Sequence, residues 1–279
     1  MRISVAVASY QYARFLPACL DSIARQTHPD FEVLIGDGGS RDGSLEIIAD
    51  YTARDSRFRL VSTADKGQAD AISRCLGHAS GDILCFLNAD DTYLCDDAFA
   101  AVVEAFSRHP GADLVSFGGV YIDAEGRSIR PVRLRYHPLD RGGLMKHRTA
   151  VLQPGTFWRR RVMEAVPLPT RFHYVFDAVF FYQAHGRFGW LELEKPVAGY
   201  RLHGDNKSMT IRPARIRELA EFERLKFGAG SWRGSYLDAV GAVAAAFGRV
   251  PRAGRALQRV LYLVVNSLSF ATVYRLPGI

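Results

Sequence analysis

Two acids and an amide follow a short apolar segment in the first third of the sequence. The segment runs from Ile83 to Leu87, follows a Gly-Asp turn, and leads directly into Asn88, Asp90 and Asp91. A short apolar run bounded by turn residues is typical of a strand buried on both faces, and open α/β sheets bind ligands beyond the carboxyl ends of such strands. Closely spaced carboxylates repel each other unless a cation lies between them. The segment therefore predicts either a cation-assisted anion site or, because Asp is also a good N-cap, only the start of a helix.

Three earlier apolar segments also predict strands with polar ends: Ile3–Ala8, Phe31–Ile35 and Phe58–Ser62. Residues with helical spacing follow each of them, and this alternation predicts parallel crossovers in a doubly wound sheet. If the strands are parallel, their polar ends meet at one edge, and the residues concerned are Ser9, Tyr10, Asp37, Asp65, Lys66, Asn88, Asp90 and Asp91. Four such ends together favour a nucleotide site with a metal.

The loop after the second predicted strand, Gly36 to Ser44, is rich in glycine. We expect it to contain too much glycine for its side chains to order it, and we expect Asp42-Gly43-Ser44 to open the next helix. No G-x-G-x-x-G motif follows the first strand and no Walker phosphate loop is present, so the sequence excludes a dinucleotide-binding Rossmann domain.

The pattern changes after Phe106. Residues 113–121 and 128–134 predict an antiparallel hairpin around the turn 123–126. A short strand is predicted at Gln153–Phe157, followed by a helix that starts at Trp158.

One acid, Asp177, lies in the predicted helix 172–185, which is otherwise nearly all aromatic and apolar. An ionised acid in an apolar helix is costly unless it has partners, so Asp177 is either functional or a solvent-facing residue of an amphipathic helix. The segment 200–208 predicts a polar loop after a strand, and an isolated histidine there, His203, is usually a surface residue.

The positive charge of the chain is confined to its last quarter. Residues 1–210 contain 25 Lys or Arg and 25 Asp or Glu, whereas residues 211–279 contain 11 and 4, which accounts for the whole net charge of +7. Helices are predicted at 214–227, 236–247 and 254–274. The basic, apolar-striped last helix is typical of a helix lying in a membrane interface, and packing against the core is the alternative. The positive charge favours an anionic partner, either a membrane surface or nucleic acid. The alternative is that the basic residues only form a solvent-exposed helical surface.

Size and composition narrow the class of protein. With 279 residues and 48% hydrophobic content, the chain can bury the core of one large domain or two small ones. No stretch reaches 18 uninterrupted apolar residues, so we expect no conventional membrane span, and the N-terminal apolar run is too short to predict a signal peptide. Four widely spaced cysteines without a CxxC pair predict reduced, mostly buried thiols and no zinc site. We therefore expect a cytoplasmic protein that can bind the inner face of the cell membrane.

Several motifs from Ile3 to Ser208 together resemble glycosyltransferase family 2, whose members have the GT-A fold. The motifs are VASYQYARFLPACLDSIARQT, FEVLIGDGGSRDGS, DKGQADAISRCLGHASGD, ILCFLNADD, QPGTFWRRRV, HYVFDAVFFYQAHG and YRLHGDNKS. Each is weak alone, but their order and spacing are specific, and they are most similar to bacterial members that build lipopolysaccharide, capsule and exopolysaccharide.

The resemblance implies an α/β, GT-A fold: a doubly wound, mostly parallel sheet with an antiparallel extension on the acceptor side and a helical C-terminal tail. It implies a nucleotide-sugar-binding half at 1–112, an acceptor-binding and catalytic half of the same domain at 113–210, and a basic helical tail at 211–279.

The resemblance also implies roles for individual residues. Donor binding falls to Ser9, Tyr10, Asp37, Asp42, Lys66, Asn88 and Asp90, and metal ligation to Asp90, Asp91 and His203. Asp37 matches the acid that hydrogen-bonds the base. Asp177 matches the general base. The family's Asp-x-Asp motif corresponds to Asn88-Ala89-Asp90, where the first acid is an amide, so metal binding rests mainly on Asp90.

The implied activity is metal-dependent transfer of a sugar, with inversion, from a UDP-, GDP- or dTDP-sugar to a glycan or lipid-linked acceptor. Mg²⁺ or Mn²⁺ suits carboxylate and phosphate oxygens.

One alternative function is that of a nucleotidyltransferase of similar fold, but that class needs a glycine-rich basic loop where this chain has SYQYARF. The other is a non-catalytic nucleotide- or nucleic-acid-binding module. Nucleic acid is not expected as a partner, because the residues between the basic side chains of the tail are mostly aliphatic, whereas binding nucleic acid requires aromatic residues there.

Overall fold

The computed structural model describes residues 1–132, 151–204, 206 and 213–247. The chain divides into two compact units, which are treated separately below. The first unit comprises Met1–Leu134, Val151–Thr170 and Phe180–His203; the second comprises Arg135–Ala150, Arg171–Val179 and Gly204–Ile279. The helix predicted at 254–274 and the last residues of the predicted hairpin lie outside the described residues.

The first unit is built on a sheet that has nine strands within the described residues. They are β1 Ile3–Ser9, β2 Phe31–Asp37, β3 Phe58–Ser62, β4 Ile83–Asn88, β5 Thr92–Tyr93, β6 Leu114–Ile122, β7 Ser128–Val132, β8 Thr156–Arg159 and β9 Trp190–Arg201. The helices around it are α1 Leu16–Ala24, α2 Ser44–Arg54, α3 Gln68–Gly77, α4 Ala98–Arg108 and α6 Arg160–Ala165, with a short 3-10 turn at Gln153–Gly155. The strand order is β3-β2-β1-β4-β8-β6-β9-β5, and β7 pairs with β6.

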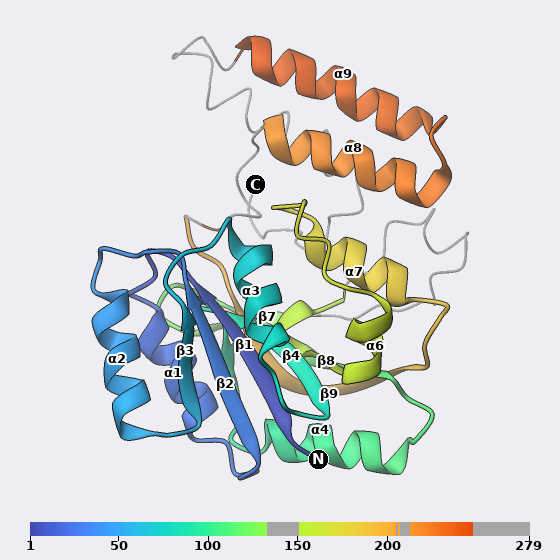
Figure 1. The fold of residues 1–279 in the computed structure, drawn as a ribbon. Coiled ribbons are helices and arrows are strands. Elements are labelled where there is room, and N and C mark those ends of the chain that lie inside the picture. Colours follow the sequence, from blue (N-terminus) through green and yellow to red (C-terminus); the bar gives the residue numbers. More distant parts are fainter. Residues whose placement is uncertain (133–150, 205, 207–212, 248–279) are drawn as a thin grey trace. The chain divides into compact units, whose positions relative to one another are not determined.

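The N-terminal half of this sheet is parallel and covered on both faces. β1 pairs in parallel with β2 and β4, and β2 pairs in parallel with β3. The chain moves outward from β1 to β3 and then returns to β4, so right-handed crossovers place α1 and α2 on one face and α3 on the other (Figure 1). Every residue of β1 and β2 is buried, which explains why both segments are apolar runs rather than alternating ones. The predicted doubly wound, mostly parallel sheet is confirmed.

The other half of the sheet carries the antiparallel extension. β8 runs antiparallel to β4 and β6, and the predicted β6–β7 hairpin is present. The long strand β9 pairs in parallel with β6 and places Arg201 opposite Ile122. Gly119 permits this pairing, because a Cβ there would lie 2.3 Å from the carbonyl oxygen of Ala198.

Two predicted boundaries in this region are wrong. The strand predicted to end at Phe157 continues to Arg159, and the helix after it begins at Arg160. Trp158 is therefore a buried strand residue, packed between the rings of Phe86 and Phe180. The run TFW is uniformly apolar, and periodicity alone does not show where such a run changes from strand to helix. The helix predicted from residue 172 is α7, Phe176–Ala184.

The second unit contains a pair of packed helices, α8 Pro213–Phe227 and α9 Trp232–Phe247. Both were predicted, with slightly later starts. The Glu218 carboxylate on α8 accepts hydrogen bonds from the backbone N–H groups of His173 and Tyr174, at 2.9 and 2.7 Å. The α8 helix thereby holds the segment that precedes α7 in the sequence.

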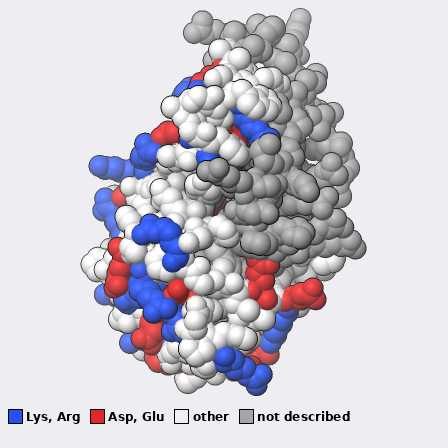
Figure 2. Space-filling model, turned by 90° about the vertical axis from the view of Figure 1, so that its right-hand side faces the viewer, with Lys and Arg blue, Asp and Glu red and all other residues white. Residues whose placement is uncertain are grey.

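The described surface carries charges of both signs. On the face drawn in Figure 2, Lys and Arg are interspersed with Asp and Glu over the described surface. None of the helices among the described residues combines the length and the apolar character that crossing a bilayer requires.

All four cysteines are free thiols. Cys19, Cys75 and Cys85 are buried and Cys95 is partly buried, as predicted. Burial raises the pKa of Cys75 and of Cys85 to about 12. A raised pKa keeps these thiols protonated at neutral pH, so they are inert residues of the core.

Candidate functional site

The polar ends of the parallel strands meet at one edge of the sheet, as predicted. Ser9 at the end of β1 pairs with Asp37 at the end of β2, and Ala8 pairs with Asn88 at the end of β4. The hydroxyl of Ser9 is buried and has no hydrogen-bond partner among the described residues. Buried polar groups are rarely left unpaired, so this atom marks the edge as a place where a ligand can bind.

The turn after β4 brings an acid and a histidine together. Asp90 Oδ2 lies 3.0 Å from His203 Nε2, with only 10% and 4% of their side chains exposed. The imidazole packs against the ring of Phe15, 4.6 Å away, and meets the edge of Tyr12 at 6.1 Å. The side chain of His203 is thus buried beside an acid, whereas its polar loop suggested a surface histidine.

The neighbouring acid, Asp91, is held inside the protein. Its Oδ1 accepts a hydrogen bond from the backbone N–H of Arg201 at 2.9 Å, and its Oδ2 accepts one from Asn88 Nδ2 at 3.3 Å. Burial raises the pKa of Asp91 well above its ordinary value, and the charge of Asp90 adds to the rise. These contacts make Asp91 a support of the turn, and its role as a metal ligand stays a prediction.

A chain of amides fixes Asn88, the residue that replaces the first acid of the motif. Gln68 Nε2 donates to Asn88 Oδ1 at 2.7 Å, and Asn88 Nδ2 donates to Gln153 Oε1 at 3.3 Å. Gln153 Nε2 in turn donates to the carbonyl oxygen of Phe86 at 2.6 Å. The sequence analysis missed Gln68 and Gln153, although each is a glutamine flanking a turn at a strand or helix end.

A buried arginine, Arg201, ties the acidic turn to the β6–β7 hairpin. Its Nε donates to the carbonyl oxygen of Asp90 at 2.6 Å, and its Nη1 donates to the carbonyl oxygens of Asp123 and Ala124 at 3.1 and 3.0 Å. Its positive charge also offsets the repulsion between Asp90 and Asp91. No sequence pattern predicts this role, because the arginine binds backbone atoms that are far away along the chain.

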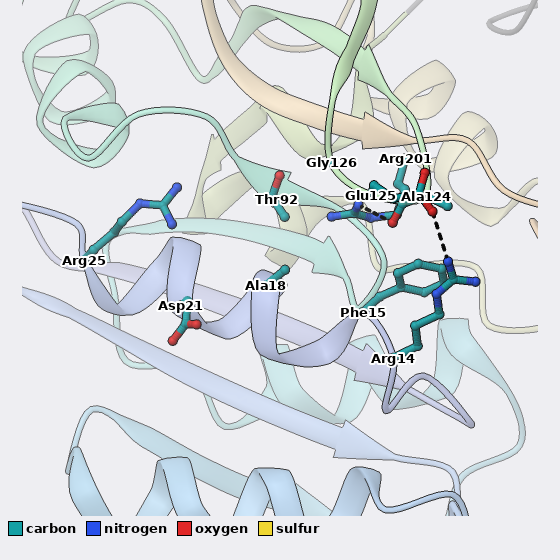
Figure 3. Close-up of a pocket in the computed structure, with 10 residues that line it drawn as sticks. All are labelled: Arg14, Phe15, Ala18, Asp21, Arg25, Thr92, Ala124, Glu125, Gly126 and Arg201. Atoms are coloured by element: carbon teal, nitrogen blue, oxygen red, sulfur yellow. Dashed lines mark hydrogen bonds and ion pairs between the residues drawn. The ribbon is translucent and has the colours of Figure 1, made fainter.

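A cavity of about 410 Å³ lies next to this arginine. Figure 3 shows α1 with Arg25, Asp21 and Ala18 on one side, and the hairpin turn with Arg201 on the other. Arg14 and Glu125 form an ion pair across it at 3.3 Å. Phe15 lines the cavity and also packs on His203, so the cavity and the acidic turn share a wall.

The loop after β2 is ordered by its own acids, so the expectation that it holds too much glycine for this is wrong. Asp37 is completely buried; its Oδ1 accepts hydrogen bonds from the N–H groups of Gly39 and Ser40, and its Oδ2 accepts one from Ser40 Oγ. Asp42 accepts hydrogen bonds from Ser44 and from the N–H of Ala13. Glycine is needed where φ is positive, at Gly39 and Gly43, but the side chains set the shape. The predicted contact of Asp37 with a base stays a prediction.

Two further predicted donor residues lie on the surface. Tyr10 is 58% exposed, and Lys66, in the loop after β3, is also exposed. The backbone N–H of Lys66 donates to Asp70 Oδ2, which fixes the loop before α3. Both side chains are accessible to a ligand.

Asp177 belongs to the second unit. It is partly buried near the start of α7, where its Oδ1 accepts a hydrogen bond from the N–H of Ala178 at 2.8 Å. Its role as the general base stays a prediction.

The Asp90–His203 pair suits a divalent cation. Neighbouring ligands of an octahedral ion with bonds of about 2.1 Å lie roughly 3.0 Å apart, which matches the separation of Asp90 Oδ2 and His203 Nε2 of 3.0 Å. Among the described residues, no group of three or more His, Cys, Asp or Glu side chains could hold a metal. A bound ion would therefore take most of its ligands from outside the protein, as Mg²⁺ does when it is held by one or two carboxylates and phosphate oxygens.

The fold is shared with solved glycosyltransferases. S. aureus TarS 1-349 in complex with UDP-GlcNAc superposes with a TM-score of 0.68 at 18% identity, over 95% of this chain and 78% of that one. The mannosyltransferase PcManGT from Pyrobaculum calidifontis, in complex with GDP-Man and Mn²⁺, superposes with a TM-score of 0.64 at 18% identity, over 98% and 85%. At this identity the likeness shows the fold, a mixed α/β sheet of GT-A type.

Sequence relatives give the family. An uncharacterized glycosyltransferase of Nostoc sp. is 27% identical over 234 residues, which cover 79% of this chain and 71% of that protein. A PGL/p-HBAD biosynthesis glycosyltransferase of Mycobacterium bovis is 42% identical over 114 residues, which cover 40% of this chain and 44% of that protein. A family profile described as Glycosyl transferase family 2 matches residues 4–166. This match spans more than half of the chain, and the protein therefore belongs to glycosyl transferase family 2.

Proposed function

We propose that this glycosyltransferase transfers a sugar, with inversion, from a nucleotide-sugar to a glycan or lipid-linked acceptor in cell-surface polysaccharide synthesis. The observation that carries the proposal is the convergence of Asp90 Oδ2 and His203 Nε2 at the carboxyl edge of the sheet that also holds the unpaired Ser9 hydroxyl. The complexes of TarS with UDP-GlcNAc and of PcManGT with GDP-Man support a nucleotide-sugar donor. The relative named for PGL/p-HBAD biosynthesis supports a lipid-linked acceptor.

The donor lies along the strand ends. Ser9 and the exposed ring of Tyr10 contact the nucleoside, and Lys66 attracts the diphosphate. Asp37 and Asp42 act by holding the loop that borders the nucleoside, since their oxygens already accept hydrogen bonds within that loop.

Asp90 and His203 are the residues that would hold Mg²⁺ or Mn²⁺. Such an ion would supply the positive charge that a leaving nucleoside diphosphate requires. Asn88 contributes no charge, so it orients Asp91 and the turn through its hydrogen bonds to Gln68 and Gln153.

Asp177 accepts the proton of the acceptor hydroxyl as that oxygen attacks the anomeric carbon. A hydroxyl of high pKa is a weak nucleophile unless a positioned base takes its proton. Direct attack opposite the leaving group inverts the anomeric configuration, and lipopolysaccharide-type glycans are the acceptors that the bacterial motifs suggest.

The basic tail, residues 211–279, brings the enzyme to an anionic membrane on its cytoplasmic side. Trp232 and Tyr236 on α9 are exposed aromatic residues of the kind that settle at membrane interfaces. Sedimentation with liposomes tests this: binding to vesicles with anionic lipid but not to neutral ones is expected, and equal partition to both contradicts it.

The chemistry is tested by incubating the protein with UDP-, GDP- and dTDP-sugars and Mn²⁺ and measuring nucleotide release and the anomeric configuration of the product. We expect Asp177→Asn to lower kcat by about 10²–10⁴-fold. Asp50→Asn, a change at an exposed acid on α2, is the matched control. Transfer that persists undiminished in both Asp90→Ala and Asp177→Asn overturns the proposal.

A further inference from the structure

The cavity beside α1 is lined by arginines near both ends of that helix. Arg14 lies just before α1, and Arg25 directly follows its last residue (Figure 3). A helix rises about 1.5 Å per residue, so these two residues lie roughly 15 Å apart along its axis. The buried Arg201 adds a third guanidinium to the lining. The cavity thus offers positive charge over a distance longer than a single phosphate group or sugar ring.

Most N–H donors of the two arginines that flank α1 are not used within the described protein. A guanidinium has five N–H donors. Arg14 donates a hydrogen bond to Glu125 Oε1, and Arg25 donates one to Asp96 Oδ1 and one to the carbonyl oxygen of Tyr93. The other donors of these two side chains have no acceptor among the described residues, so they can bind a ligand.

The two acids in the lining already have partners. Glu125 accepts hydrogen bonds on both carboxylate oxygens, from Arg14 at 3.3 Å and from Arg127 at 3.1 Å. Asp21 Oδ1 accepts a hydrogen bond from the hydroxyl of Tyr51 at 2.5 Å. The cavity therefore has more donors than acceptors to offer, and this imbalance favours a ligand that is rich in acceptors and negatively charged.

The cavity adjoins the turn where the reaction is proposed to occur. Phe15 lines the cavity, and its ring lies 4.6 Å from the imidazole of His203. Arg201 also lines it and donates a hydrogen bond to the carbonyl oxygen of Asp90 at 2.6 Å. Neither Asp90 nor His203 belongs to the lining. A ligand in the cavity therefore lies beside this pair without taking its place.

We propose that the cavity beside α1 binds a negatively charged stretch of the glycan acceptor, away from the hydroxyl that reacts. The anionic groups are carboxylates of acidic sugars or phosphodiesters, because both accept paired hydrogen bonds from a guanidinium. The distance between Arg14 and Arg25 suits an extended chain that carries several such groups. The inference rests on the proposed glycan acceptor and adds the charge that this acceptor carries.

The test is oligosaccharide binding by the full chain, measured calorimetrically without donor and without Mn²⁺. The probes are an oligogalacturonate, a mannose oligosaccharide linked by phosphodiesters, and a neutral malto-oligosaccharide of the same length. At least one acidic probe is expected to bind about tenfold or more tightly than the neutral one, and its affinity should fall as the salt concentration rises. The acidic probe that binds more tightly identifies the anionic group.

Variants locate the binding in the cavity. Ala18 lines the cavity at an exposed position on α1, so Ala18→Glu places a carboxylate among the arginines, and Ala18→Gln is its uncharged control of nearly equal size. We expect Ala18→Glu to bind the acidic probe at least about tenfold more weakly than Ala18→Gln. Arg14→Gln should also weaken binding about tenfold. Arg108→Gln, at an exposed arginine on α4 that pairs with Glu104, should leave it unchanged.

The outcomes distinguish this inference from the proposed function. Equal affinity of the wild type for acidic and neutral probes overturns the inference, as does equal binding by Ala18→Glu and Ala18→Gln. An equal loss in Arg14→Gln and Arg108→Gln would show that the probe binds the overall positive charge, and it also overturns the inference. Sugar transfer is measured separately. A protein that transfers from no nucleotide-sugar but binds acidic glycans in the cavity overturns the proposed function alone.

Discussion

Two acidic loops at the same edge of the sheet use their carboxylates in opposite ways. In the loop after β2, Asp37 and Asp42 accept hydrogen bonds from their own loop and its neighbour, so they hold the backbone in shape. In the turn after β4, Asp90 faces a histidine, and its neighbour Asp91 is buried at the cost of a raised pKa. The comparison teaches that an acid at a strand end has a structural role when amide donors of its own loop surround it, whereas an acid paired with a histidine places two possible metal ligands side by side.

Removing Asp90 should produce the largest effect, and on activity rather than on stability. We expect Asp90→Ala to lower Mn²⁺-dependent transfer about a thousandfold, because it removes the only carboxylate of the Asp90–His203 pair. The free energy of unfolding should change by less than about 1 kcal/mol, since the lost hydrogen bond to His203 is offset by reduced repulsion on Asp91. Steady-state kinetics and urea denaturation measure the two quantities. If Asp90→Ala lowered the free energy of unfolding as much as Asp37→Ala does, the proposed difference between the two loops would be wrong.

Removing Asp37 should act mainly on stability. Asp37→Ala leaves two N–H groups and a hydroxyl without their acceptor in a buried loop, and we expect it to lower the free energy of unfolding by about 3 kcal/mol. Urea denaturation measures this loss. Asp37→Asn, which keeps one oxygen, is the matched control and should lose less; equal losses would show that the hydrogen bonds to the carboxylate do not hold the loop.

Replacing Asn88 by aspartate, the first acid of the family motif, should increase the difference in cation binding between the two loops. Asn88→Asp replaces the amide 3.3 Å from Asp91 Oδ2 with a second carboxylate, so we expect the metal-free protein to lose roughly 2 kcal/mol of stability. The added charge should also enlarge the rise in Tm on adding Mn²⁺. Asn88→Ala, which removes the amide without adding charge, is the control. A Tm rise no larger than in wild type would argue that the cation binds away from this turn.

The smallest effect concerns pH. Burial alone would raise the pKa of Asp42, but hydrogen bonds from Ser44 and from the N–H of Ala13 outweigh it and lower the pKa. A lowered pKa in the folded state means that the ionised form contributes stability above the unfolded pKa of about 3.9, and that this contribution is lost as the pH falls. The difference in unfolding free energy between wild type and Asp42→Asn should therefore be constant near neutral pH and shrink below about pH 4. Urea titrations across this range measure it, and a difference that grows on acidification contradicts the assignment.

Much of the first unit could be predicted because burial on both faces leaves a plain signal. β1, β2 and β4 are short apolar runs, and their polar ends fall at one edge once the strands are parallel. The two-residue strand β5 was not predicted, since it is too short to show a period.

The parts of the site that escaped prediction depend on contacts far apart in sequence. Arg201 binds the carbonyl oxygens of Asp90 and Asp123, 111 and 78 residues away, and no local pattern reveals such a pairing. The structural role of Asp37 did leave a trace. A serine three residues after an aspartate is a common sign of side-chain hydrogen bonds to a turn, and Ser40 stands at that distance.

The buried, protonated cysteine thiols of the core make selective labelling of this protein possible. Alkylating dyes react with thiolates, and Cys75 and Cys85 have pKa values of about 12, while that of Cys95 is about 11. A single cysteine introduced on the surface would then be the preferred point of attachment for a fluorophore. Because the native cysteines should react little with the dye, donor binding can be followed by fluorescence without first replacing them.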